Sequence, residues 1–552
     1  MEPGSLALVL HAHLPFVRHP EYEGALEEHW LYEALTESYI PLLLVLDRLV
    51  EDGIDFRLAF SLTPTLVSML GDPLLQSRYL RRLELLIELA EKEIARTSRR
   101  SESRRFHALA RMYHRRFREV RDAFLHRYRR NLVHPFGRLQ RLGKIEIVAS
   151  AATHGYLPLL SASSSAVRAQ IGVGLQAYEQ AFGIRPRGFW LPECGFYPGV
   201  DAILRDHKVR YTFLETHGLT RARPRPIHGV YAPIYCPSGV AAFGRDPESS
   251  KQVWSSTEGY PGDPDYREFY RDVAYDREPA YVRSYIHPTG ARIDTGIKYF
   301  RITGRHDRKE VYVPERAEQR AELHARDFAG KRAEQIRLLS DAMDRKPLIV
   351  APYDAELFGH WWYEGPLWLD RFIRLLASGQ TGLRLVTPSE YLNEYPSNQV
   401  AAPAASSWGY KGFHEVWLNG TNDWIYRHLH HAAGCLQSLA ARHPQAAGLT
   451  RRALNQALRE LLLAQASDWA FMMKSGAVTD YAVRRTKSHL LRLARLCDEI
   501  DRGAIDRSRL LVAESRNNIF PHIEYRQLLD GPLESGASNA GGESDRGDRS
   551  PM

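Results

Sequence analysis

The sequence has little cysteine and no long hydrophobic run. Its 552 residues include four cysteines, Cys194, Cys236, Cys435 and Cys497, none of them in a CxxC pair. Such widely spaced thiols fit a reducing compartment and argue against a disulfide framework or a zinc knuckle. No stretch reaches the roughly 18 apolar residues of a membrane span, and the first residues lack the basic region and cleavage site of a secretion signal. We therefore expect a cytoplasmic protein with no membrane partner.

The composition also lacks the bias of a disordered or fibrous chain. Hydrophobic residues make up 44% of the sequence and charged residues 25%, which is ordinary for a soluble globular protein of two or three domains. The net charge of +8 comes from arginines concentrated in helical stretches such as residues 99–130. Because no nucleic-acid-binding module accompanies this charge, we expect no nucleic-acid partner.

Short apolar runs that end in polar residues recur along the chain. They span residues 6–10, 56–60, 145–149, 189–191, 211–214, 348–350 and 383–386. Each run has the length of a strand, and most of the intervals can hold a crossover helix, which predicts a parallel α/β sheet or barrel. In such folds the chemistry gathers at the carboxyl ends of the strands.

The irregular spacing of these runs indicates insertions. Residues 74–141 read as charged amphipathic helices, and residues 221–305 read as long loops that would cover a cleft. The sequence thus predicts a catalytic barrel over residues 1–400, a helical C-terminal domain over 401–530 and a disordered tail over 531–552.

Two acidic residues follow strand-like runs and have aromatic neighbours. Glu193 lies in WLPECG beside Trp190, and Asp354 lies in APYDAELFGHWWYEGP near Trp361. Glycoside chemistry uses two carboxyl groups, one as an anion at the oxocarbenium-like centre and one as proton donor to the leaving oxygen, while aromatic faces stack on sugar rings. Either acid alone would more simply cap a helix or pair with an arginine. Two of them at the ends of separate strands favour a catalytic pair.

Three histidines also follow strand-like runs. His11 and His13 form an HxH pair that puts both imidazoles on one face, and His154 follows the run at 145–149. With Glu215 or His217 they could hold a metal. We favour contacts with sugar hydroxyls and with the nucleophile, because a metal would neutralise the anion that Glu193 supplies. We expect no metal and no other cofactor.

Five segments resemble the ordered motifs of glycoside hydrolase family 57. They are HAHLPF at His11, AATHGYLPLL at Ala151, WLPECG at Trp190, YDAELFGHWW at Tyr353 and SDWAFMM at Ser467. The order and spacing match over nearly the whole chain, through about Leu529. Within the family the chain resembles the 1,4-α-glucan branching enzymes in GVAAFGRDPESSKQVWS, EGYPGDPDYREFYRD and SWGYKGFHEVWLNGTNDWIYRHLH. The resemblance implies an incomplete (β/α)7 barrel with a helical insert and an all-helical C-terminal domain, and it implies no metal.

The resemblance also implies a set of roles. Glu193 would be the nucleophile and Asp354 the general acid/base of a retaining enzyme that transfers α-1,4-glucan to form α-1,6 branches. We expect the charge of Glu193 and burial near Trp361 to raise the pKa of Asp354. Asp468 and Arg267 would hold sugar hydroxyls. A monomer is favoured.

The resemblance further makes Trp408 and Trp417 stacking platforms for sugar rings. Both lie in a Gly- and Asn-rich stretch in which the apolar residues have no helical or strand periodicity. The alternative is an aromatic cluster that seals the domain junction. A platform needs one open aromatic face, whereas a sealing residue has both faces covered.

Four other functions stay open. An α-amylase-type hydrolase and a 4-α-glucanotransferase would use the same carboxyl pair. A metal-dependent carbohydrate deacetylase is suggested by the HxH pair on the first strand of a similar barrel. A non-catalytic glucan-binding protein would keep the aromatic platforms, but the intact Glu193 and Asp354 argue against it.

Overall fold

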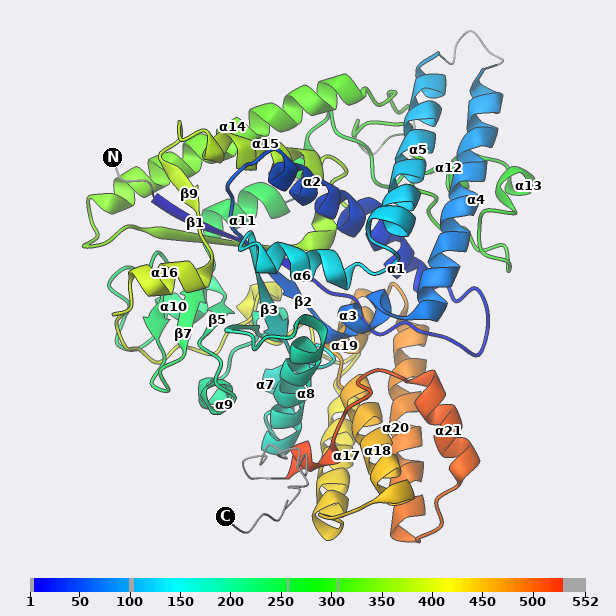
Figure 1. The fold of residues 1–552 in the computed structure, drawn as a ribbon, viewed down its shortest axis with the longest axis vertical. Helices are drawn as coiled ribbons and strands as arrows, with labels where there is room; N and C mark the ends of the chain where they lie inside the picture. Colours follow the sequence, from blue (N-terminus) through cyan, green and yellow to red (C-terminus); the bar gives the residue numbers. More distant parts are fainter. Residues whose placement is uncertain (1–3, 99–103, 256–257, 305, 307, 530–552) are drawn as a thin grey trace, which may run out of the picture.

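A computed structural model describes residues 4–98, 104–255, 258–304, 306 and 308–529. The expected disordered tail, 531–552, lies outside the described residues. The centre of the molecule is a curled sheet with helices around it (Figure 1). Its strands are β1 Gly4–Ala12, β2 Leu58–Leu62, β3 Ile145–Ser150, β4 Gly188–Trp190, β5 Tyr211–Leu214, β6 Ile234–Tyr235, β7 Ala241–Gly244, β8 Leu348–Asp354 and β9 Leu383–Leu385.

The sheet is an incomplete barrel of parallel strands. Its order is β6-β7-β5-β4-β3-β2-β1-β8, and every neighbouring pair from β7 to β8 is parallel. All nine residues of β1 are buried, as expected for a strand covered on both faces. Seven parallel strands with connecting helices confirm the predicted incomplete (β/α)7 barrel.

Three strands differ from the expectation. β6 and β7 lie inside the segment 221–305 that was predicted to be loops. β7 nevertheless pairs with β5 in parallel. Its sequence, AAFG, is rich in small residues and has little strand propensity of its own. The last predicted strand, β9, forms, but it pairs only with Gly4–Leu6 at the start of β1 and lies off the main order.

Helices fill the intervals between the strands. They are α1 Glu28–Ala34, α2 Ile40–Glu51, α3 Pro64–Leu70, α4 Pro73–Thr97, α5 Arg104–Asp122, α6 Val133–Arg141, α7 Leu157–Leu160, α8 Ser164–Phe182, α9 Val200–Asp206, α10 Thr216–Thr220, α11 Pro247–Trp254, α12 Val273–Asp276, α13 Pro279–Val282, α14 Pro314–Ser340, α15 Gly365–Ala377 and α16 Pro388–Glu394. Two segments are π-helical, η1 Leu35–Tyr39 and η3 Ala123–Arg127. The 3-10 turns are η4 Pro192–Cys194, η5 Tyr260–Gly262, η6 Ala355–Leu357, η7 Tyr410–Gly412 and η8 Tyr525–Leu528.

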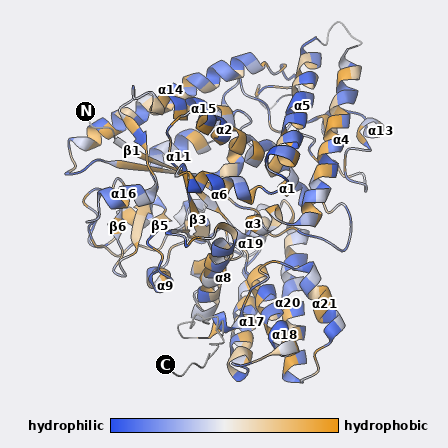
Figure 2. Cartoon of the chain, viewed as in Figure 1, coloured by the Kyte–Doolittle hydropathy of each residue, from blue (hydrophilic) through white to orange (hydrophobic). Residues whose placement is uncertain are grey.

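The C-terminal region is a helical bundle beside the barrel (Figure 1). Its helices are α17 Trp424–Arg442, α18 Gly448–Ala464, α19 Ser467–Ser475, α20 Thr479–Asp501 and α21 Arg507–Arg516. Figure 2 shows β1 as mainly hydrophobic, whereas α5 and the bundle helices carry many hydrophilic residues. One hydrophobic core runs through the barrel and the bundle, so the two are packed against each other. No helix in the described ranges is both long enough and apolar enough to cross a membrane.

Candidate active site

The carboxyl ends of neighbouring strands bring the predicted site residues together. His11 near the end of β1 is in register with Asp354, the last residue of β8. Ser150 at the end of β3 is in register with Trp190, the last residue of β4, and Glu193 follows in the turn η4. In a parallel barrel these ends form one edge, which is where the polar groups can meet a ligand.

Glu193 is held in a constrained conformation. Its φ of 61° is left-handed, which is uncommon for a residue with a side chain and marks sites where surrounding contacts fix the backbone. The indole of Trp408 donates to one carboxylate oxygen at 2.7 Å, and the Ser467 hydroxyl donates to the other at 2.9 Å. Burial raises the pKa of Glu193 to about 7, against the effect of these two hydrogen bonds.

Asp354 is a second carboxyl group with a raised pKa. Burial raises its pKa to about 6, while the nearby Arg245 guanidinium and an indole hydrogen bond from Trp254 oppose the shift. The pKa moves in the expected direction and burial is the cause that raises it, but the expected contribution from the charge of Glu193 is absent. Arg245 directly follows β7 and Trp254 ends α11, so the segment that follows β7 reaches this carboxyl group.

Glu356 is a third carboxyl group at this edge, two residues after Asp354. One of its oxygens accepts from the backbone N–H of His13 at 3.1 Å and from the hydroxyl of Tyr39. Burial and the charge of Asp354 raise its pKa to about 7. Tyr39 comes from the π-helical segment η1, a geometry often found at functional sites.

The three predicted histidines form one cluster, in which His11 and His154 are hydrogen-bonded and His13 stacks on both. His11 and His154 share a hydrogen bond of 3.1 Å between their Nε2 atoms, and the His13 and His154 rings stack with centroids 3.8 Å apart. His154 Nδ1 lies 3.0 Å from the hydroxyl of Ser467, which binds Glu193. Burial lowers the pKa of His11 and of His154 well below the usual value, so both rings are neutral at pH 7.

His13 differs from the other two histidines in the direction of its pKa shift. Its Nε2 lies 3.1 Å from both carboxylate oxygens of Asp468. Burial lowers the pKa of His13, but the carboxylates of Asp468, Glu193 and Glu356 outweigh burial and raise it. The site therefore carries one imidazole that is readily protonated, held by Asp468 of α19.

The residues considered for a metal do not form a ligand set. Glu215 pairs with Arg245 at 3.1 Å, and His217 shares a hydrogen bond with the carbonyl oxygen of Gly412 at 2.8 Å. Across the described parts of the chain, no group of three or more His, Cys, Asp or Glu side chains has an arrangement that could hold a metal ion.

The predicted tryptophans have different surroundings. Trp190 is fully buried and stacks on His11 at 4.5 Å, and Trp417 is 1% exposed and stacks on Tyr156 at 4.3 Å. The prediction of an open stacking face at Trp190 or Trp417 is therefore wrong, because neighbouring side chains cover both rings. Trp408 is partly exposed. Trp361 is 53% exposed and stacks on Phe269, which leaves its other face available.

The expectation that Arg267 holds sugar hydroxyls is also wrong. Its side chain is 1% exposed and lies 3.5 Å from the carboxylate of Glu37. The guanidinium sits over the ring of Tyr363 at 4.0 Å and donates to the carbonyl oxygen of Gly296 at 3.3 Å. Arg267 instead fixes Glu37, which forms a 2.6 Å bond with His360.

Sequence reasoning missed several residues of this site. Ser467 and Glu356 each lie within two residues of a predicted residue, so their motifs could have suggested them. Tyr39 lies in a buried helical stretch, where nothing in the pattern separates it from a core residue. Its role depends on the π-helical turn, which the sequence does not reveal.

Residues 7–405 match the family described as "Glycosyl hydrolase family 57", and residues 428–527 match "1,4-alpha-glucan branching enzyme, C-terminal". The chain is 33% identical to a 1,4-alpha-glucan branching enzyme of Thermococcus kodakarensis, over 96% of this chain and 79% of that protein.

Solved structures resemble the whole chain. The α-amylase AmyC from Thermotoga maritima is 46% identical with a TM-score of 0.89, covering 95% of this chain and 99% of its own. A GH57-type branching enzyme from Pyrococcus horikoshii is 33% identical with a TM-score of 0.85, covering 96% of this chain and 98% of its own.

Proposed function

Because the chain belongs to glycosyl hydrolase family 57, we propose that it cleaves α-1,4 bonds of an α-glucan and re-forms them as α-1,6 branches. The observation that carries this proposal lies in the helical bundle. The region that matches the branching-enzyme C-terminal family contains Ser467 and Asp468, whose side chains bind Glu193 and His13. The bundle therefore belongs to the active site, and we assign residues 1–400 to the barrel and 401–530 to the domain that completes it.

We assign the first chemical step to the carboxyl pair. Ionised Glu193 attacks the anomeric carbon while protonated Asp354 gives its proton to the leaving oxygen, which produces a glycosyl-enzyme. Trp408 and Ser467 hold the attacking carboxylate in place through its two oxygens. The neutral His11 and His154 and the hydrogen-bonded His13–Asp468 pair supply donors and acceptors for sugar hydroxyls.

In the second step Asp354 acts as a base instead of an acid. Asp354, now a carboxylate, accepts the proton of the incoming 6-hydroxyl of another glucan chain. Asp354 is a carboxylate at this point because it gave its proton to the leaving oxygen in the first step. We assign sugar stacking at this edge to Trp361 and Trp408, the two predicted platforms with exposed surface. A monomer remains our prediction.

Hydrolysis is the second candidate, since the relative of known structure with 46% identity is an α-amylase. The test incubates the full-length protein with amylose and counts new reducing ends and, after debranching, new α-1,6 linkages. Branching forms new α-1,6 linkages with few or no new reducing ends, because the anomeric carbon is transferred to a glucan hydroxyl and not to water. Reducing ends without α-1,6 linkages would instead make the protein a hydrolase, and redistributed chain lengths with neither would make it a 4-α-glucanotransferase. Glu193→Gln is the control, with an expected loss of several orders of magnitude.

A further inference from the structure

The positive charge of the protein is concentrated in one segment. Residues 104–141, which form α5, η3 and α6, contain twelve arginines and two acidic residues, a net charge of +10. The whole chain carries +8, so all other residues together carry a net charge of −2. A neutral glucan gives no reason for this concentration of charge, and the proposed active site does not use these residues.

One face of α5 is a row of exposed arginines. Arg104, Arg111, Arg115 and Arg118 follow helical spacing, and all four are exposed. None of them has an ion-pair partner among the residues that the structure describes. Like charges three and four positions apart destabilise a helix by about 0.2–0.5 kcal/mol per pair. We call this row the α5 arginine row.

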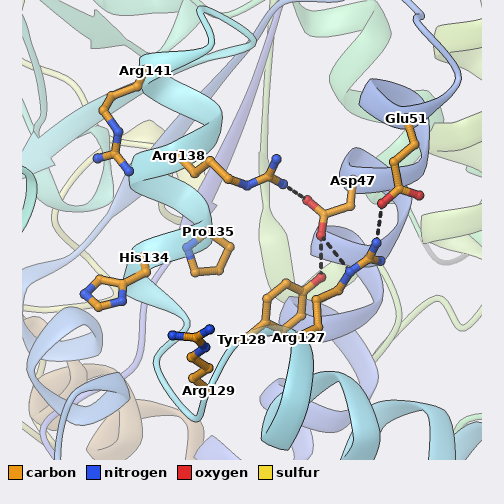
Figure 3. A pocket seen from close by; sticks show the side chains of 9 residues that line it. All are labelled: Asp47, Glu51, Arg127, Tyr128, Arg129, His134, Pro135, Arg138 and Arg141. Carbon is orange, nitrogen blue, oxygen red and sulfur yellow. Dashed lines mark hydrogen bonds and ion pairs between the residues drawn. The ribbon is translucent and has the colours of Figure 1, made fainter.

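Where α5 is followed by η3 and α6, the structure forms a cavity of about 630 Å³. Its size lies within the roughly 300–1,000 Å³ of small-molecule sites. Figure 3 shows the lining side chains, which come from α2, from η3 and the turn after it, and from α6: Asp47, Glu51, Arg127, Tyr128, Arg129, His134, Pro135, Arg138 and Arg141. Asp47 lies eight residues along the helix from Tyr39, about 12 Å, so this cavity is separate from the proposed active site.

The charges in the cavity are only partly paired. Arg138 pairs with Asp47, and Arg127 pairs with Glu51 and lies 3.6 Å from Asp47 (Figure 3). Arg129 and Arg141 have no charged partner among the described residues. The four arginines and two carboxylates leave a net charge of +2.

We propose that this cavity binds the phosphate group of a phosphate ester. Arg129 and Arg141, which lie at different ends of the cavity (Figure 3), would reach the phosphate by rotation of their exposed side chains. A phosphate dianion balances the charge of +2, and guanidinium groups bind its oxygens by paired, charge-assisted hydrogen bonds. The acidic residues fix Arg127 and Arg138 in place and leave the other two arginines free for a ligand. The ester is either a free sugar phosphate or a phosphate on a glucan chain, which the α5 arginine row would attract at longer range.

The test measures binding by calorimetry on the full-length protein, at constant ionic strength. The probes are inorganic phosphate, glucose 6-phosphate and a phosphorylated glucan, with glucose and an unphosphorylated glucan as uncharged counterparts. Arg129→Gln/Arg141→Gln removes the proposed ligands, and neither side chain has an ion pair whose loss would disturb the fold. Arg111→Gln/Arg115→Gln is the matched control, because it removes the same charge from the α5 arginine row.

We expect glucose 6-phosphate to bind saturably with one site per chain, and the Arg129/Arg141 variant to weaken it at least tenfold, since each charge-assisted bond contributes strongly. The control variant should bind it within about twofold of the parent. Binding of the phosphorylated glucan alone would identify the polymer as the source of the ester. Equal losses in the two variants would show diffuse attraction rather than a site, and the absence of saturable binding to every phosphate probe would overturn the proposal.

Discussion

At the scale of single residues, the catalytic proposal depends on the protonation of two carboxyl groups. The chemistry needs Glu193 ionised and Asp354 protonated. Burial raises both pKa values, to about 7 and about 6. Below about pH 6 both groups hold a proton and the nucleophile is lost, and above about pH 7 both are ionised and the acid is lost. Between these values one proton remains, and it resides mainly on Glu193, whose pKa is the higher. The active form, with that proton on Asp354, is therefore the minor one of the two singly protonated forms.

We therefore predict a narrow, bell-shaped dependence of kcat/KM on pH, with limbs near 6 and 7 that belong to the pair. The measurement is the initial rate on a maltooligosaccharide at low concentration across pH 4–10. In Trp408→Phe, Glu193 loses the hydrogen bond that favours its charged form, so the limb that reports ionisation of Glu193 should move to higher pH. A broad plateau from pH 5 to 9 in the parent protein would contradict this assignment.

The tryptophans show what a sequence pattern does and does not reveal about single residues. The family resemblance assigned Trp408 and Trp417 the same role, yet Trp408 is hydrogen-bonded to Glu193 and Trp417 packs against Tyr156. Exposure depends on packing partners that are distant in sequence, such as Tyr156 against Trp417. A β-carbon on Gly409 would lie 2.6 Å from the Trp417 ring, which shows how closely the chain covers it.

Trp417→Ala and Trp408→Ala should accordingly fail in different ways. Loss of the buried Trp417 ring should destabilise the protein by about 3–5 kcal/mol. Trp408→Ala removes a donor to Glu193 from a partly exposed position, so it should lower branching strongly with a smaller change in Tm. The paired measurement is Tm and specific activity of the folded fraction. An unchanged Tm in Trp417→Ala would mean that the ring is not a core residue.

At the scale of elements, the π-helical segment η1 connects a barrel helix to the catalytic edge. Its extra residue lets Glu37 and Tyr39 both face the loop after β8, where they bind His360 and Glu356. The Ser38 hydroxyl also donates to the backbone carbonyl of Glu356, at 3.3 Å. We infer that η1 positions η6, the turn that follows Asp354.

Tyr39→Phe tests this role of η1. It keeps the ring and removes only the hydroxyl that donates to Glu356, so kcat should fall about tenfold while KM changes little. Tyr32→Phe is the matched control, since its hydroxyl donates to Glu28 at 2.8 Å in α1, two turns earlier. Equal activities of the two variants would show that η1 does not position the loop after β8.

The sequence predicted most of the strands because a short run of apolar residues marks a segment that becomes buried in the sheet. Seven of the nine strands lie at or within three residues of such a run. The sequence did not predict β7, because AAFG forms a strand only through its pairing with β5. It did not predict β6, because that strand has only two residues. These are cases in which tertiary contacts decide the local structure.

At the scale of the whole molecule, the barrel and the helical bundle share the active site and the core. Ser467 N–H donates to the carbonyl oxygen of His154 at 3.1 Å, and Gly155 forms a β-bridge with Ala466. Thr153 donates to the carbonyl oxygen of Leu462. The residues that follow β3 are thus joined directly to the start of α19, where Ser467 binds Glu193. The family resemblance placed Ser467 in a motif, but only the fold shows that the motif crosses this boundary.

This joint predicts that damage inside the bundle unfolds the barrel with it. Leu458 lies in α18, is fully buried and is not one of the residues to which we assign a catalytic or binding role. Leu458→Ala should cost about 2–5 kcal/mol and lower Tm, yet calorimetry should still show one transition whose calorimetric and van't Hoff enthalpies agree. Activity should disappear at the temperature of that transition, because Glu193 loses Ser467 and Trp408 when the bundle unfolds. Two separated transitions, with activity persisting above the first, would show that the barrel holds its catalytic geometry without the bundle.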